Sequence, residues 1–227
     1  MKFLRALLAI CKKDLLCEFR KKERIGTLIF FGVIVIFIFS FAFGADPKLL
    51  KSLSPGLIWI VSFFSSLLAL ERSFQSEAEE GCLDRLILYS ASHAAVLLGK
   101  LITNFIFIFF VQCVIFFLMK ILFDLENPAS FSTLAAAFFL GNLGIATLGT
   151  FYAALVTSLK ARQAMLPLLL FPMLIPLLLA CVVVTEEAWG GSVVTNAAPW
   201  LKMMMVFDGI FLAACLLAIS PIFESNP

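Results

Sequence analysis

The sequence has almost none of the residues from which enzymes build metal centres or nucleophilic sites. It contains one histidine, His93, which we interpret as an interfacial loop residue. A zinc site or a His-based catalytic triad would therefore need unusual partners. No two cysteines form a Cys-x-x-Cys pair or lie in segments that we place outside, so we expect no disulfide framework and interpret them as small apolar helix residues (Cys11, Cys17, Cys82, Cys113, Cys181 and Cys215).

A phosphate-binding loop of the form GxxxxGK[ST] is also missing. The chain does not bind ATP by that route, so any ATP-driven work needs another polypeptide. Charge is scarce too: 14% of the 227 residues are charged, whereas 62% are hydrophobic. A soluble domain is nearer about 45–50% apolar. The composition therefore predicts a non-catalytic, polytopic membrane protein of one domain, residues 1–227, with no nucleic-acid partner.

Apolar runs of the length that crosses a bilayer, about 20 residues, recur along the chain. We predict an all-α fold with six transmembrane helices, at residues 25–44, 55–70, 96–119, 133–158, 165–184 and 203–223. Lys100 lies near the start of the third span, and we expect its long side chain to reach back to the membrane interface. Small residues of the fourth span (Gly141, Gly144, Gly149) predict close helix packing, within one subunit or against a second copy.

Residues 1–24 precede the first span and are rich in Lys and Arg. Apolar residues recur there at helical spacing, which predicts an amphipathic helix on the inner membrane surface (Leu4, Leu8, Cys11, Leu15 and Phe19). One alternative is a solvated basic tail. Another is a signal peptide that ends near Ala42-Phe43-Gly44, although the basic region is long for one and the following run is long enough to span.

Positive charge is distributed unevenly between the two sides of the predicted membrane. The chain has 17 Lys and Arg, and all but four fall in segments that we place inside; the four are Lys48, Lys51, Lys120 and Lys202. This asymmetry usually sets orientation, so both termini are predicted to be cytoplasmic in a bacterial inner membrane. Trp59, Trp189 and Trp200 fall near the predicted outer interface, where an aromatic belt would place them.

The segment between the second and third spans, residues 71–95, is charged and helix-prone. Phe74, Ala78, Cys82 and Leu86 recur at helical spacing beside an acidic face. A short helix of this kind docks into a groove on a soluble partner, and a solvated charged loop is the alternative.

Two features inside the spans are candidates for function. Pro167, Pro172 and Pro176 lie in the fifth span, where each removes a backbone donor and predicts a kinked or locally broken helix. Broken helices often line transport paths, and plain packing kinks are the alternative. Asp208 is the acid placed most clearly inside a span, either as a functional carboxylate or as a hydrated one near the outer end.

Three stretches resemble the haem exporter protein B (CcmB) family, the membrane permeases of the cytochrome c maturation system. They are PGLIWIVSFFSSLLALERSF at 55–74, EEGCLDRLIL at 79–88 and MLPLLLFPMLIPLLLA at 165–180. The first is long and specific, whereas an acidic-Gly-x-Leu-acidic pattern also occurs in many ABC exporter permeases. The chain departs from the family at Cys82, where Ser or Thr is usual, and at Tyr89-Ser90, where Leu-Pro is common.

The resemblance implies a permease that pairs with a separate ATP-binding subunit on the cytoplasmic face. The segment after the second span would be the coupling helix, with Glu71, Glu80, Gly81, Leu83 and Asp84 as the residues carried over. The other implied partners are a haem-handling membrane subunit, a periplasmic haem chaperone and a second copy of the chain. Haem would be a cargo and ATP would be bound by the partner.

Two mechanisms and two rival functions stay open at this point. The complex either exports haem or releases the haem-loaded chaperone, and the lack of His and Cys in the predicted outside loops favours release. An ABC exporter permease for another apolar cargo is the first rival function. A non-transporting scaffold subunit is the second.

Overall fold

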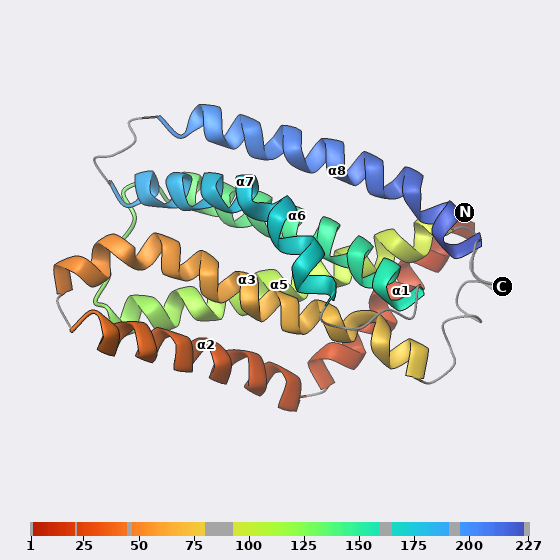
Figure 1. Ribbon diagram of the computed structural model, residues 1–227, viewed down its shortest axis with the longest axis horizontal. Coiled ribbons are helices and arrows are strands. Elements are labelled where there is room, and N and C mark those ends of the chain that lie inside the picture. Colours follow the sequence, from red (N-terminus) through yellow and green to blue (C-terminus); the bar gives the residue numbers. More distant parts are fainter. Residues whose placement is uncertain are drawn as a thin grey trace.

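A computed structural model describes residues 2–20, 22–44, 47–79, 93–158, 165–190 and 196–224. Within these ranges the chain forms helices and no strands (Figure 1). The helices are α1 (Lys2–Arg20), α2 (Lys22–Ala42), α3 (Pro47–Glu79), α5 (His93–Leu122), α6 (Phe131–Ser158), α7 (Met165–Ala188) and α8 (Ala198–Glu224).

Six of these helices are long and apolar enough to cross a membrane, which confirms the predicted all-α fold with six spans. They run along the long axis of the molecule, while α1 lies at one end of the bundle (Figure 1). The C-terminal part of α8 lies at this same end, as an even number of crossings requires. We call it the terminal end of the bundle.

Helix α3 extends beyond the predicted second span in both directions. Residues 47–54, predicted as part of a polar loop, form its first turns, and Pro47 occupies the first position, where a missing N–H is not needed. The hydroxyls of Ser52 and Ser54 donate to the carbonyls of Leu49 and Lys51, at 2.9 and 2.7 Å. At the other end, residues 71–79 of the predicted charged segment continue α3 as one helix.

Helix α6 lies at the centre, packed against α3, α5, α7 and α8. Its glycines allow these close approaches: a Cβ on Gly141 would meet the Trp59 ring, and one on Gly149 would meet Leu70. The prediction that these small residues pack helices closely within one subunit is therefore confirmed.

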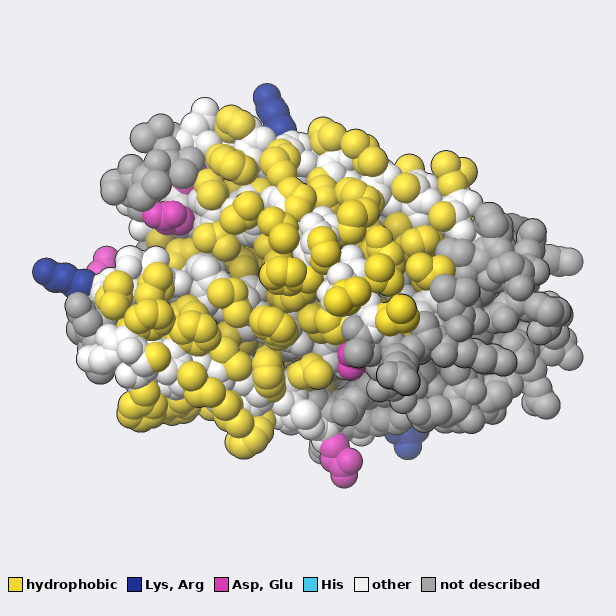
Figure 2. Space-filling view, in the orientation of Figure 1, with side chains coloured by type: hydrophobic (Ala, Val, Ile, Leu, Met, Phe, Trp, Pro, Cys, Tyr) yellow, Lys and Arg dark blue, Asp and Glu magenta, His cyan; other side chains and the backbone are white. Residues whose placement is uncertain are grey.

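Hydrophobic side chains cover the middle of the visible face, and charged ones appear toward its edges (Figure 2). Exposed large apolar residues occur on each spanning helix, for example Phe41, Ile121 and Leu217. An apolar surface of this extent suits lipid rather than water.

Trp59 departs from the predicted aromatic belt. Its side chain is 1% exposed, and its indole Nε1 donates to the Thr185 hydroxyl at 2.9 Å. The belt prediction is wrong for this residue because Gly141 leaves a space that the ring fills. Trp189 and Trp200 are half-buried, and Trp189 donates to the Glu126 carbonyl at 3.1 Å.

Candidate functional site

A buried lysine organises the terminal end of the bundle. Lys100 lies two turns into α5, and its side chain is 2% exposed. Its Nζ donates to the Ser73 carbonyl of α3 at 2.9 Å and pairs with Asp14 Oδ2 of α1 at 3.3 Å. The prediction that Lys100 reaches back to the interface is therefore wrong, because acceptors on two neighbouring helices satisfy its charge inside the protein.

Helix α1 packs closely on the start of α5 at the same place. Gly99 makes this possible, since a Cβ there would lie 2.9 Å from Ile10 Cγ2. The Cys11 thiol is buried in this contact and donates to the Gly99 carbonyl at 3.2 Å. Burial raises the pKa of the Cys11 thiol.

The buried face of α1 differs from the predicted apolar stripe. Cys11, a member of the stripe, is buried as predicted, whereas Leu8 of the stripe is 59% exposed and Ile10, outside the stripe, is buried. Asp14 is 13% exposed and also pairs with Lys13, Nζ to Oδ1, at 3.1 Å. The docked face therefore includes an acid, which a purely apolar periodicity does not detect.

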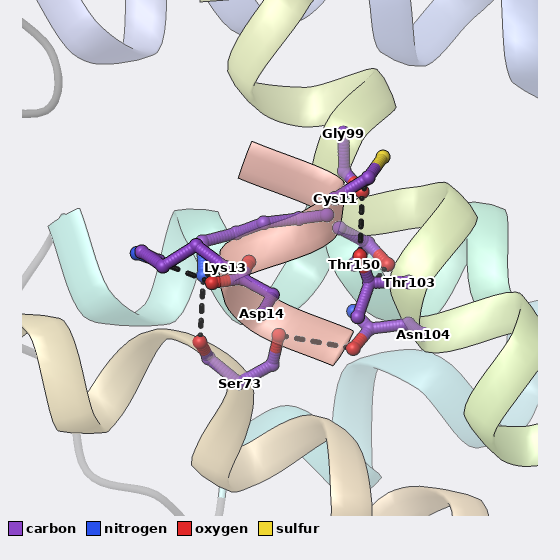
Figure 3. A network of polar contacts seen from close by, with 9 residues as sticks. Cys11, Lys13, Asp14, Ser73, Gly99, Thr103, Asn104 and Thr150 are labelled. Atoms are coloured by element: carbon purple, nitrogen blue, oxygen red, sulfur yellow. Dashed lines mark hydrogen bonds and ion pairs between the residues drawn. The ribbon is translucent and has the colours of Figure 1, made fainter. Parts of the chain in front are cut away.

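Hydrogen bonds extend this cluster into the bundle (Figure 3). The Ser73 hydroxyl donates to Asn104 Oδ1 at 3.1 Å, and Asn104 Nδ2 donates to the Thr150 hydroxyl at 2.9 Å. Asn104 lies on α5 one turn beyond Lys100, and Thr150 lies on α6. Polar contacts thus join α1, α3, α5 and α6 in one cluster, which we call the Lys100 cluster: Cys11, Asp14, Ser73, Gly99, Lys100, Asn104 and Thr150.

The Lys100 cluster has members that precede and members that follow residues 80–92 in the sequence. Ser73 lies in the last turns of α3, and Lys100 lies in the first turns of α5. The cluster therefore joins the C-terminal turns of α3 to the N-terminal turns of α5. The Cys11 thiol of the cluster donates to a backbone carbonyl and its pKa is raised by burial, so it is not an activated nucleophile, and the contacts of the cluster hold helices together.

The predicted site residues fall partly within the described structure. Glu71 lies in α3, half-buried, while Glu80, Gly81, Leu83 and Asp84 lie outside the described residues. Helix α7 stays helical across Pro172 and Pro176, and a kink there remains a prediction. His93 is the first residue of α5, so it is a helix residue.

An apolar cavity of about 310 Å³ opens between α3 and α7. Aromatic rings line much of it (Trp59, Phe63, Phe64 and Phe171). Its lining contains no His, Cys, Met or Tyr, so these walls provide no side chain of the usual kinds that ligate haem iron.

Asp208 is buried inside the bundle, contrary to the reading that it is hydrated. Its side chain is 4% exposed, and neither carboxyl oxygen has a hydrogen-bond partner among the described residues. Gly144 of α6 makes room for it, since a Cβ there would lie 2.6 Å from Asp208 Oδ1. The inward direction of α8 at this position decides the outcome, and an apolar run does not reveal it.

We expect Asp208→Asn to stabilise the protein by about 1 kcal/mol, because an amide of the same shape neither buries a charge nor has to take up a proton when the chain folds. Thermal unfolding of the detergent-solubilised chain measures this. Asp124, an exposed acid of the α5–α6 connection, provides the control, and Asp124→Asn should be neutral. A less stable Asp208→Asn variant would show that the carboxyl has a partner outside the described residues.

The fold and the Lys100 cluster define a multi-pass α-helical membrane protein with no enzyme-like site among its described residues. A sequence model described as CcmB protein matches residues 5–224, and the chain belongs to the CcmB family. Heme exporter protein B of Pseudomonas aeruginosa is 33% identical over 164 residues, which cover 71% of this chain and 72% of that protein.

Two further relatives have the same name. Heme exporter protein B of Haemophilus influenzae is 29% identical over 181 residues, 80% of this chain and 81% of that protein. The protein of that name in Rhodobacter capsulatus is 31% identical over 171 residues, which cover 75% of this chain and 78% of that protein. The match extends along most of each chain, so the similarity includes the spans and not one motif alone.

Sequence reasoning missed the Lys100 cluster as a site. The available signals were a lysine inside an apolar run and an acid on a neighbouring amphipathic helix. Lys100 and Asp14 are 86 residues apart, so only the folded chain shows that they pair.

Proposed function

We propose that this chain is the membrane permease subunit of an ABC transporter complex that acts in cytochrome c biogenesis. A separate subunit would hydrolyse ATP on the cytoplasmic side, and the complex would export haem or release a haem-loaded periplasmic chaperone. The observation that carries the proposal is membership of the CcmB family, together with relatives named heme exporter protein B.

The arrangement of α3 and α5 supports a position for the contact with the ATP-binding subunit. Helix α3 ends and α5 begins at the terminal end of the bundle (Figure 1), and the predicted coupling residues Glu80, Gly81, Leu83 and Asp84 lie between these helices in the sequence. We propose that this end faces the cytoplasm, where an ATP-binding subunit would contact the segment together with Glu71. The complex would also contain a haem-handling membrane subunit and a second copy of this chain.

Chaperone release is the favoured mechanism. The cavity between α3 and α7 lacks the usual iron ligands, and so do the loops that we place outside. A chain of this kind could drive a conformational step in the complex without ligating haem itself. Direct export would instead need a path in which the porphyrin makes only apolar contacts.

The test uses cells deleted for this gene and complemented with the wild-type chain or with Asp84→Arg. A charge reversal in the coupling segment should abolish covalent haem in c-type cytochromes, because it repels a basic surface that an acid would attract. Staining for covalent haem on cytochromes and on the chaperone measures this. Glu126→Arg, in an exposed connection at the far end of the bundle, provides the matched control.

Four outcomes are possible, and they separate the mechanisms. Loss of cytochromes with accumulation of the loaded chaperone would support ATP-linked release. Loss of both would favour a role in haem supply, including direct export. Normal cytochromes with Asp84→Arg would contradict the coupling residue, and normal cytochromes in the deletion strain would contradict the haem function altogether.

A further inference from the structure

The Lys100 side chain has an unusual position for a lysine in a membrane protein. Long basic side chains near span ends usually extend to the water interface. Here the side chain is 2% exposed and its Nζ is held between α1 and α3. Its placement therefore ties together two helices that an apolar residue at this position would only touch.

Lys100 and these two acceptors belong to three different helices. The Ser73 carbonyl is part of α3, which leads into residues 80–92, and Lys100 is part of α5, which leaves them. Asp14 is on α1, which is separated from that segment in the sequence by α2 and α3. Lys100 is thus a direct link from the segment's two flanking helices to α1.

A buried ion pair resists small displacements more strongly than apolar packing does. If α1 moved along α5 by about the length of one residue, the Lys100 ammonium would stay buried but would lose Asp14. Separating a buried ion pair in this way costs free energy. Apolar contacts tolerate the same slide because they have no preferred direction. The pair therefore favours α1 moving together with the ends of α3 and α5.

We propose that Lys100 is a positioning residue that locks α1 to the ends of α3 and α5, so that α1 follows the coupling segment when it moves. The lock itself follows from the contacts described above. The movement of the segment rests on the proposed function, with ATP hydrolysis by a partner as its cause.

Native cysteines provide the measurement. Cys11 lies on α1 and is buried where this helix packs against Gly99 of α5, whereas Cys17, on the same helix, is exposed. Trypsin separates them into the peptides ALLAICK and DLLCEFR, so mass spectrometry can follow alkylation of each thiol. The thiolate is the form that reacts with an alkylating reagent, and burial raises the pKa of the Cys11 thiol. Cys11 should therefore be alkylated slowly while α1 is docked on α5.

We expect Lys100→Met to speed labelling of Cys11 by about tenfold, the factor that corresponds to losing one hydrogen bond to a charged group. Cys17 should be unaffected. Lys51→Met removes the exposed Lys51–Glu126 pair, 3.4 Å long, at the far end and is the matched control. The experiment uses native membranes that contain the assembled complex, with and without ATP.

A double variant tests whether the pair with Asp14 is responsible. Lys100→Met with Asp14→Leu removes both charges of this pair together, so docking, slow labelling and cytochrome maturation should return toward wild type. A role for Lys100 in the stability of α5 alone would not be rescued by a change on α1. The double variant also keeps the proposal testable if Lys100→Met alone fails to accumulate.

The proposal predicts that ATP changes Cys11 labelling in wild-type membranes, and that Lys100→Met labels fast in both states and loses cytochrome maturation. Wild-type labelling rates in Lys100→Met without ATP would overturn the lock, whatever the function. Fast labelling with normal maturation would overturn the transmitting role. A failure of the haem function itself appears separately, as normal cytochromes in the deletion strain.

Discussion

Gly141→Ala is expected to destabilise the protein by about 1–3 kcal/mol, and Gly141→Val is expected to prevent folding. A Cβ at this position would overlap Trp59 Cη2 and would lie 2.6 Å from Cys181 Sγ. Both neighbours are buried, so neither side chain can move away without displacing others. Reversible unfolding in mixed detergent micelles measures the loss.

Gly209 provides the matched control for this prediction. It lies on α8 with open space where a Cβ would be, so Gly209→Ala should be neutral or stabilising by up to about 1 kcal/mol. Trp59→Phe supplies a second check, because a smaller ring makes room for the methyl group that Gly141→Ala introduces. The double variant should recover part of the loss, with a coupling energy of about 0.5–3 kcal/mol. Equal stability of Gly141→Ala and Gly209→Ala would contradict the close packing.

Trp59→Ala is expected to remove about 3–5 kcal/mol of stability, the usual range for deleting a buried large aromatic side chain. The Trp59 ring meets Phe138 edge to face, with centroids 5.8 Å apart, and donates to the Thr185 hydroxyl. Deleting it opens a cavity beside Gly141 and ends both contacts. The same unfolding measurement applies, with the protein monitored by circular dichroism.

Two variants separate the contributions to this loss. Trp59→Phe keeps an aromatic ring but loses the hydrogen bond, and we expect it to cost about 1–2 kcal/mol. Trp200→Ala alters a half-buried tryptophan near the start of α8 and should cost less than Trp59→Ala. If the two alanine variants are equally stable, the assignment of Trp59 to the core is wrong.

Much of the fold could be predicted from local sequence. A span of about 20 apolar residues is a local property, so the six spans were predictable one by one. Their ends were harder, because Pro47 and the serines of residues 47–54 are as compatible with a first helical turn as with a loop. The charged residues 71–79 likewise continue a helix that hydropathy alone would end.

The faces of the helices were not predictable in the same way. Several spans are apolar all round, so hydropathy does not distinguish a lipid-facing residue from a core one. Trp59, Lys100 and Asp208 were all expected near an interface, and all three are buried because particular partners or glycines face them. These contacts join distant parts of the chain, which a single sequence does not reveal.

The length of α3 has a geometrical consequence. Its 33 residues form one helix about 50 Å long, whereas the apolar core of a bilayer is about 30 Å thick. The helix packs against α2, α5, α6 and α7. If α3 tilted as a rigid rod about these contacts, its Ser73 end and its Lys51 end would move in opposite directions, so a push on one side of the membrane would become a movement on the other.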